Sequence, residues 1–213
     1  MNKGIKQLIL TLSLCAAMQC GAQLTSKKVF IEAPFDVIPT LPQLSRLDMI
    51  DYFEGGITKA VPTLFNDEAI IKALEDNHIN VTTSESSAVD LYTTAIGNDS
   101  VIVFIETMMI PAQDSKVTLY DTEWNVIETL DGGTLEDWIT PEASKAKKLN
   151  DTMNTVSFMT SRANFDPMDG ILTFVSTIDE TLTQDDFTRV KDDLKQSREF
   201  KIGIKGFKPI ERK

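Results

Sequence analysis

Apolar residues are most concentrated between Ser87 and Thr129, where several short runs follow one another. The central run, residues 101–105, is uninterruptedly apolar and rich in β-branched side chains, which is typical of a strand covered on both faces. Residues 116–120 alternate between apolar and polar positions, and turn-forming residues at 97–100 and 112–115 separate the runs at hairpin length. The pattern predicts an antiparallel meander over residues 87–129.

Helix N-termini are indicated where a Ser or Thr is followed three residues later by an acidic residue, the spacing of a capping box. These pairs are Ser45 with Asp48, Thr134 with Asp137, and Thr183 with Asp186. Each pair predicts a short helix, and the last helix is expected to run to about Gln196. Residues 23–43 contain three prolines and are predicted to be extended, whereas residues 66–77 fit either a helix or a short strand and turn.

Two further strands are predicted at residues 156–163 and 171–178. The segment from Phe200 to Lys205 alternates apolar residues with lysine and glycine, as an edge strand does. The elements together predict an α+β fold with a mainly antiparallel β-sheet, the meander 87–129 at its centre, and a few helices packed on one side.

Residues 1–22 have the order of features found in a secretory signal peptide: a charged start, an apolar run and small residues at the end. Cleavage after Ala22 would leave a single α+β domain of residues 23–213, and a division into two lobes near residues 131–155 stays open. Lipid attachment through Cys20 is the alternative processing route. The sequence therefore predicts export to the periplasm or the extracellular space, and it predicts no transmembrane segment in the mature chain.

The chain is strongly acidic, with a formal net charge of −11, and loss of the two lysines in the signal peptide would move it to −13. Such a charge argues against a nucleic-acid partner, because phosphates are repelled. Both cysteines, Cys15 and Cys20, lie within the predicted signal, so the mature chain has no thiol for a disulfide, a nucleophile or a metal. We expect no cofactor and no tight transition-metal site.

Catalytic motifs are absent from the sequence: it has no nucleophile elbow, zinc-protease motif, phosphate-binding loop or dinucleotide fingerprint. His78 is the single histidine and follows polar residues, which indicates a solvated loop or helix end. Asp166 and Asp169 beside a glycine are the candidate cation ligands, but their spacing differs from that of a calcium loop. A hairpin turn is the favoured interpretation of this segment.

Four residues are candidates for binding a partner. Trp124 in a turn and Trp138 on a short helix are large aromatic side chains that stack on sugars or anchor interfaces when exposed, although core packing is the favoured role of both. Lys201 and Lys205 lie in a C-terminal stretch of net charge +5, residues 195–213, that suits an anionic partner. Protection of an edge strand by lysine is the favoured explanation of this charge.

Three stretches carry a resemblance to a known family. They are the run from Ile38 to Phe53, the run DSKVTLYDTEW from Asp114 to Trp124, and the helical stretch from Leu182 to Leu194. They resemble an uncharacterised family of exported proteins, a domain of unknown function, from gut-type Gram-negative anaerobic bacteria. The resemblance implies export and one shared architecture, and it transfers no catalytic or binding residue.

The sequence as a whole favours an exported, non-catalytic binding module whose partner is an unknown protein or glycan of the cell envelope. One alternative is a hydrolase that acts on glycan through a pair of carboxyl groups, since such a pair is defined by distance in space. Another is a structural component of the envelope. Each alternative stays open, because no residue is assigned to a reaction.

Overall fold

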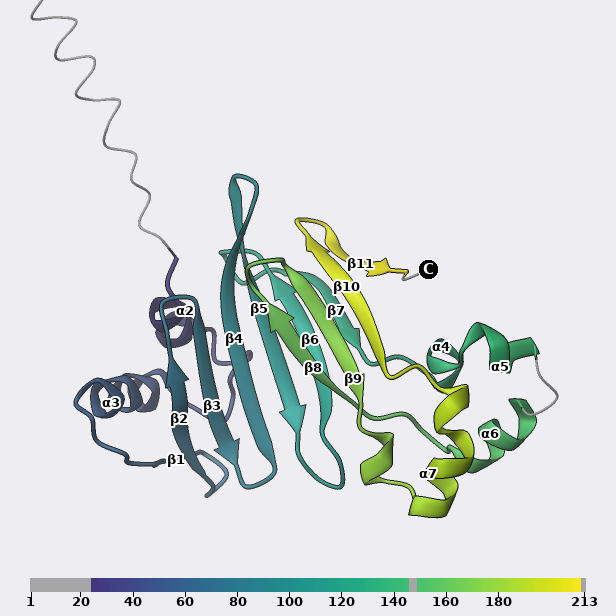
Figure 1. The fold of residues 1–213 in the computed structure, drawn as a ribbon. Helices are drawn as coiled ribbons and strands as arrows, with labels where there is room; N and C mark the ends of the chain where they lie inside the picture. The colour runs from purple at the N-terminus through teal and green to yellow at the C-terminus, as the bar shows by residue number, and fades with distance from the viewer. Residues whose placement is uncertain (1–23, 146–148, 212–213) are drawn as a thin grey trace, which may run out of the picture.

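The computed structural model describes residues 24–145 and 149–211, so the predicted signal peptide and Cys20 lie outside the described residues. A seven-stranded antiparallel sheet, in the order β1-β2-β3-β4-β5-β6-β7, forms the body of the molecule (Figure 1). Its strands are β1 Val61–Pro62, β2 Glu68–Leu74, β3 His78–Ser84, β4 Ser87–Ile96, β5 Asp99–Met108, β6 Asp114–Tyr120 and β7 Val126–Asp131. The strand order equals the chain order, so the predicted meander is confirmed as β4 to β7, and β1, β2 and β3 extend the sheet beyond β4.

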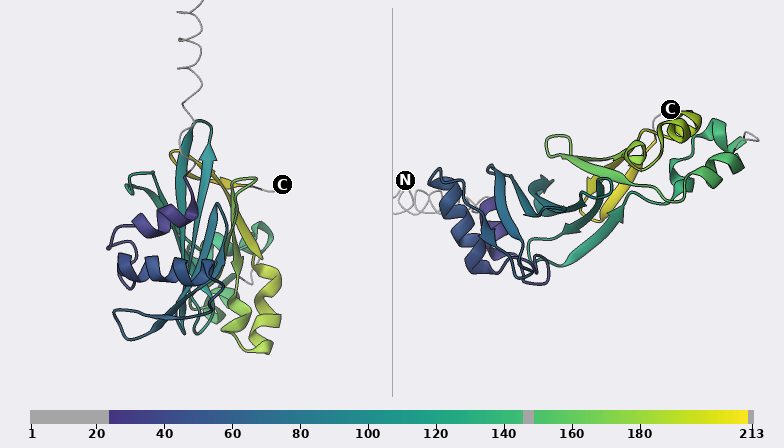
Figure 2. Two further views of the ribbon diagram at one scale, coloured as in Figure 1. Left: turned by 90° about the vertical axis from the view of Figure 1, so that its left-hand side faces the viewer. Right: turned by 90° about the horizontal axis from the view of Figure 1, so that it is seen from below.

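A second antiparallel sheet has the order β11-β10-β9-β8. Its strands are β8 Ser161–Asp166, β9 Ile171–Ser176, β10 Ser197–Gly203 and β11 Gly206–Ile210. Figure 2 shows this sheet on one face of the larger sheet, opposite the N-terminal helices. The α+β class with a mainly antiparallel sheet is confirmed. The strands predicted at residues 171–178 and 200–205 belong to the second sheet, and the strand predicted at 156–163 begins at Ser161, but the separation into a second sheet was not predicted.

The two faces of β5 belong to two different hydrophobic cores. Ile102 and Phe104 face α2 Ser26–Glu32 and α3 Gln43–Glu54, whereas Val101, Val103 and Ile105 face the second sheet. All five side chains are buried, with at most 2% of their surface exposed. The prediction of a strand covered on both faces is therefore confirmed, and alternation along β5 divides its side chains between the two cores.

The N-terminal lead-in contains a helix, α2, followed by turns up to Pro42, and the expectation of an extended segment over residues 23–43 was wrong. In α2 the side chain of Thr25 accepts a hydrogen bond from the amide of Lys28, and the prolines of this region follow the helix rather than interrupt it. Ser26 is buried, and its hydroxyl donates to the carbonyl of Glu75 in the β2–β3 turn at 2.5 Å. Helix α2 is thereby fixed to the sheet at its first residue.

Helix α3 begins at Gln43 with Pro42 as its N-cap, so Ser45 and Asp48 are not its capping pair. The amide of Arg46 donates to the carbonyl of Pro42 at 3.1 Å, so Ser45 already lies inside the helix. The side chain of Arg46 is buried and donates to two carbonyls at the end of α2, those of Phe30 at 2.8 Å and Ala33 at 2.7 Å. The side chain of Arg46 thereby joins α3 to the end of α2.

The remaining helices follow the meander and pack beside the second sheet. They are α4 Leu135–Trp138, α5 Pro141–Lys145, α6 Leu149–Thr155 and α7 Gln184–Val190. The capping pairs at Thr134 and Thr183 are confirmed, but α7 ends at Val190 because a 3₁₀ turn follows it, well before Gln196. Within residues 24–145 and 149–211, no helix combines the length and apolar character needed to cross a membrane.

Two strand assignments are also corrected. Residues 66–77 contain a strand, β2, and a turn, so the helical alternative is wrong. Strand β10, which carries Lys201, lies between β9 and β11 and is not an edge strand. The chain turns back after Gly203 because Gly206 adopts a positive φ of 120°, and β11 forms the edge.

Candidate functional site

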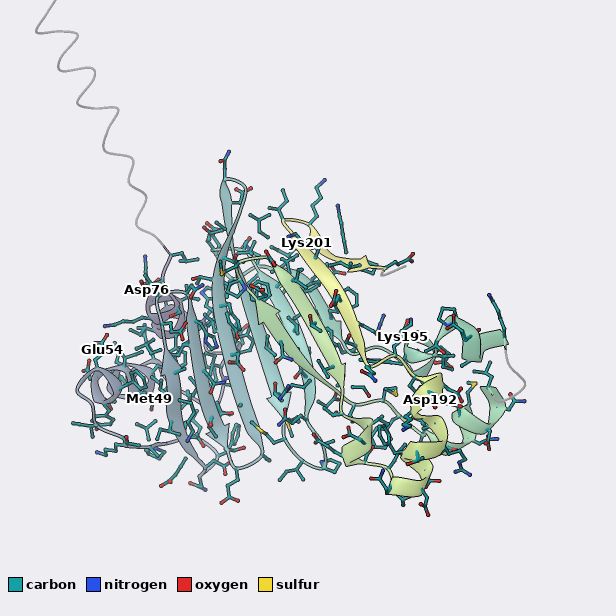
Figure 3. All side chains as sticks on the ribbon, in the orientation of Figure 1. Met49, Glu54, Asp76, Asp192, Lys195 and Lys201 are labelled. Carbon is teal, nitrogen blue, oxygen red and sulfur yellow. The ribbon has the colours of Figure 1, made fainter. Side chains whose placement is uncertain are left out.

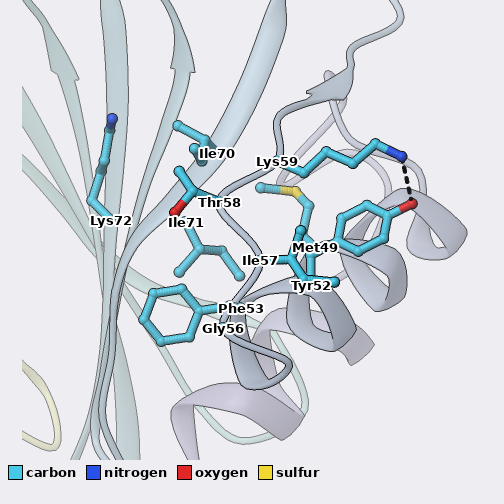
Figure 4. A pocket seen from close by; sticks show the side chains of 10 residues that line it. All are labelled: Met49, Tyr52, Phe53, Gly56, Ile57, Thr58, Lys59, Ile70, Ile71 and Lys72. Atoms are coloured by element: carbon cyan, nitrogen blue, oxygen red, sulfur yellow. Dashed lines mark hydrogen bonds between the residues drawn. The ribbon is translucent and has the colours of Figure 1, made fainter.

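A pocket of about 390 Å³ lies between α3, the segment that follows it, and the outer strands of the large sheet (Figure 4). This volume is within the range of small-molecule and cofactor sites, about 300–1,000 Å³. The pocket is lined by Met49, Tyr52, Phe53, Gly56, Ile57, Thr58, Lys59, Ile70, Ile71 and Lys72.

The end of α3 creates one wall of the pocket. The amides of Gly55 and Gly56 donate to carbonyls of the last turn of α3, and Gly56 has a φ of 67° that favours glycine. The amide of Ile57 then donates back to the carbonyl of Tyr52 at 2.8 Å. The chain is thereby turned so that residues 57–59 run beside α3 before they reach β1.

Strand β1 is too short to pair with the whole of β2, so the rest of β2 forms the opposite wall of the pocket. Val61 pairs with Ala69 and Pro62 with Glu68, and the pairing ends there. Ile70, Ile71 and Lys72 of β2 therefore line the pocket instead of a neighbouring strand.

The walls of the pocket are mainly apolar and partly accessible. Phe53 and Ile57 keep 38% and 55% of their surface exposed, although both are large apolar residues. Figure 4 shows them between Lys72 on one side and the pair of Lys59 and Tyr52 on the other. In that pair, the ammonium Nζ of Lys59 donates to the Tyr52 hydroxyl at 3.1 Å and lies 4.6 Å from the ring centroid.

The charge of the pocket is opposite to that of the chain. Lys59 and Lys72 are its two charged residues, and none of the described residues that line it is an Asp or a Glu. The whole chain has 32 acidic and 21 basic residues, so this is a locally positive site on a negative protein. The arrangement suits a ligand with apolar groups and a negative charge, and it provides no carboxyl pair for glycoside hydrolysis.

A second cluster lies on the face of β3 and β4 that points away from α2 and α3. His78 is placed opposite Tyr92, and Asn80 opposite Asp90, so the register of the two strands brings all four together. The imidazole stacks on the Tyr92 ring at 4.1 Å, and its Nε2 lies 2.8 Å from Oδ1 of Asp90. Asn80 donates to the same oxygen at 2.8 Å.

The expectation of a solvated loop for His78 was therefore wrong. The polar string before it is the β2–β3 turn, and His78 itself is the first residue of β3. The pKa of Tyr92 is raised by burial, and the negative charges of Asp90 and Glu75 raise it further. No hydroxyl of the described chain hydrogen-bonds to the imidazole, so the cluster has an oriented histidine without a nucleophile. The alternation of polar residues at 78, 80, 90 and 92 is the sequence signal that was available for it.

The two tryptophans predicted from the sequence lie apart from the pocket. Trp138 is fully buried, and its indole Nε1 donates to the carbonyl of Gly132 at 2.7 Å, as a core residue does. Trp124 lies in the turn between β6 and β7 with a φ of 65°. Its ring packs against the Tyr120 ring in an edge-to-face arrangement, with 5.3 Å between the ring centroids. The favoured role in packing agrees with both positions.

The predicted lysines and aspartates lie at the other end of the molecule, and Figure 3 shows Lys201 far from Met49 of α3. Lys201 is exposed and donates to the backbone carbonyl of Asp169, whereas Lys205 lies in the turn between β10 and β11. Asp166 accepts the amides of Met168 and Asp169 at 2.8 and 3.2 Å, which is a turn contact. Among the residues described, no three His, Cys, Asp or Glu side chains form a metal-binding group.

The described features define a two-sheet α+β protein with an open, positively charged pocket beside an edge strand. Comparison with known sequences shows that the chain belongs to the family described as "Protein of unknown function (DUF3256)", whose model matches residues 17–205. The family resemblance is thus confirmed at this level, and the export that it implied stays a prediction.

A solved structure shows that the fold occurs elsewhere. The chain is similar to a structure described as a domain of an uncharacterized protein from Porphyromonas gingivalis W83, with a TM-score of 0.69 and 19% sequence identity. The similarity covers 87% of this chain and 98% of the other. No curated protein matches the chain.

Proposed function

We propose that the protein is an exported, non-catalytic binding module that takes a protein or glycan partner of the cell envelope in the pocket between α3 and β2. The observation that carries the proposal is the accessible apolar wall of the pocket, Phe53 and Ile57, next to a free sheet edge and two lysines. Water-exposed apolar side chains gathered at one concave place are typical of an interaction site.

Export is supported by the order of charged, apolar and small residues in the first 22 positions. It fits the absence of cysteine from the rest of the sequence, which makes folding independent of the redox state of the compartment. The envelope is the place where a partner for such a module would be met.

The proposal is tested by capture from solubilised cell envelopes with the purified mature chain. The double variant Phe53→Ser and Ile57→Ser removes the apolar wall while it leaves the buried faces of α3 and β2 unchanged. A matched control, Phe158→Ser and Ile204→Ser, makes the same kind of change at residues that are 57% and 48% exposed elsewhere.

We expect a defined partner that the wild type and the control capture and the pocket variant loses. Capture that is equal in all three chains would contradict the assignment of the pocket. Turnover of an envelope glycan by the purified chain would instead establish the hydrolase and end the proposal of a non-catalytic module.

A further inference from the structure

We infer that the pocket binds an extended acidic peptide segment, which adds as a strand to the free edge of β2. This inference rests on the proposed function and names the class of its partner. Strand addition to an open sheet edge is a common mode of peptide recognition, in which backbone hydrogen bonds give affinity and side-chain pockets give specificity.

The backbone of β2 provides the edge. Strand β3 pairs with residues 70–74 of β2 on one side, and β1 covers the other side at Glu68 and Ala69 alone. In residues 24–145 and 149–211, no strand pairs with the outer side of residues 70–74. The pocket opens along this same stretch, at Ile70, Ile71 and Lys72, so the space beside the edge is available to a ligand.

The side chains beside the edge suit alternate residues of a bound strand. Met49 is a nearly buried residue of α3 beneath the pocket, and Phe53 and Ile57 form the accessible wall. A strand that added here would turn every second side chain toward this apolar surface. Polar side chains are few, since Tyr52, Thr58 and the two lysines are the only ones among the described lining residues. An oligosaccharide has many hydroxyl groups, each of which costs free energy when it is buried without a hydrogen-bond partner, so a peptide is favoured over a glycan.

The charge of the site selects an acidic strand. Lys72 lies at an irregularity in the β2–β3 register, between the paired residues Ile71 and Ala73. A lysine at a bulge of an open edge discourages unspecific strand pairing. A bound strand that places a carboxylate near Lys72 gains an ion pair where an uncharged strand would leave the lysine unpaired. Lys59 offers a second cation on the other side of the pocket (Figure 4). The acidic surface of the rest of the chain then repels such a peptide from other positions.

Three labelled nine-residue peptides test the inference by fluorescence anisotropy with the mature chain. The first alternates Val and Thr and has one Glu near each end; the second has Lys in place of Glu; the third is the first with N-methyl groups on alternate backbone amides. Oligogalacturonate, an anionic glycan without amide groups, competes with the first peptide in a fourth measurement.

We expect the first peptide to bind, and the Lys and N-methylated peptides to bind at least about tenfold more weakly, a difference of about 1.4 kcal/mol. The double reversal Lys59→Glu and Lys72→Glu should exchange the preference, so that the Lys peptide becomes the better ligand. The matched reversal Lys205→Glu and Lys208→Glu, on exposed residues of the second sheet, should leave the preference unchanged.

Two results would overturn the inference. Equal binding of the plain and N-methylated peptides would show that the edge of β2 takes no part, and tight binding of oligogalacturonate with no peptide binding would assign the site to a glycan. If envelope capture still depends on Phe53 and Ile57 in either case, the proposed function stands and this inference alone fails. If capture is independent of those residues, both fail.

Discussion

Arg46 provides the sharpest test of how the N-terminal helices are held on the sheet. Its guanidinium is buried, with 2% of the residue exposed, and it donates to the carbonyls of Phe30 and Ala33 at 2.8 and 2.7 Å. The carbonyl of Phe30 has Pro34 at the position four residues on, and proline has no N–H to offer it. Arg46 therefore supplies a donor that the local sequence lacks.

The substitution Arg46→Met keeps the length of the side chain and removes the donors. Each buried carbonyl left without a partner costs about 1–3 kcal/mol. Part of this cost is offset, because the buried guanidinium is itself poorly solvated: its Nε has no hydrogen-bond partner in the described chain, and burial lowers the pKa of Arg46. We expect a net loss of about 2–4 kcal/mol in the free energy of unfolding.

Urea denaturation of the mature chain measures this loss. With a slope of about 2 kcal/mol per molar urea, the midpoint should fall by about 1–2 M without a change in slope. Arg162→Met on β8 is the matched control at an exposed residue, with an expected change within about 0.5 kcal/mol. Equal midpoints for the two variants would refute the reasoning, because the cost of burying Arg46 would then cancel its hydrogen bonds.

Two further predictions concern the core and a turn. Phe104→Ala should destabilise the protein by about 3–5 kcal/mol, through lost burial and the cavity left between β5 and α2. The control Lys205→Ala should change the urea midpoint little. A mild effect at Phe104 would show that β5 is not the centre of the fold. The pKa of Asp121 is lowered, chiefly by a hydrogen bond from the side chain of Asn125 and also by the amides of Asn125 and Glu123. The ionised carboxylate therefore stabilises the fold at pH values above the pKa of the unfolded chain. This contribution is lost as the pH falls through the lowered pKa of the folded protein. Asp121→Ala should therefore lower stability at pH 7 by less than about 1 kcal/mol, since the group is exposed, and the difference from wild type should shrink in acid; a constant difference across that range would contradict the assignment.

The meander was predictable because its signals are local. The apolar run 101–105 and the turns on either side of it determine strand and hairpin positions without reference to the rest of the chain. The capping pairs at Thr134 and Thr183 were predictable for the same reason. Ser45 with Asp48 has the same spacing but misled, because the helix begins earlier, at Gln43 after Pro42, and Ser45 lies inside it.

The pocket was beyond sequence reasoning, and the His78 cluster had only the alternation of polar residues as a signal, because both depend on register between separate elements. The pocket exists where β1 stops pairing with β2 and α3 lies across the gap, and no single segment contains that information. His78 follows three polar residues, so its neighbours concealed the strand that begins with it. The candidate residues chosen from the sequence, Trp124 and Trp138, were chosen by type, and type alone does not distinguish packing from binding.

The central claim, that a partner occupies the pocket beside α3 and β2, is tested most directly by cross-linking in intact cells. Ile57, on the accessible wall, is replaced by the photoreactive amino acid benzoylphenylalanine, and Ile204, which is 48% exposed on the second-sheet side, is replaced in a matched variant. The account predicts a discrete cross-linked product from position 57 that loses intensity when Lys59 and Lys72 are reversed in charge, and none from position 204. A product from position 204 alone, or one of equal intensity from both positions, would contradict it.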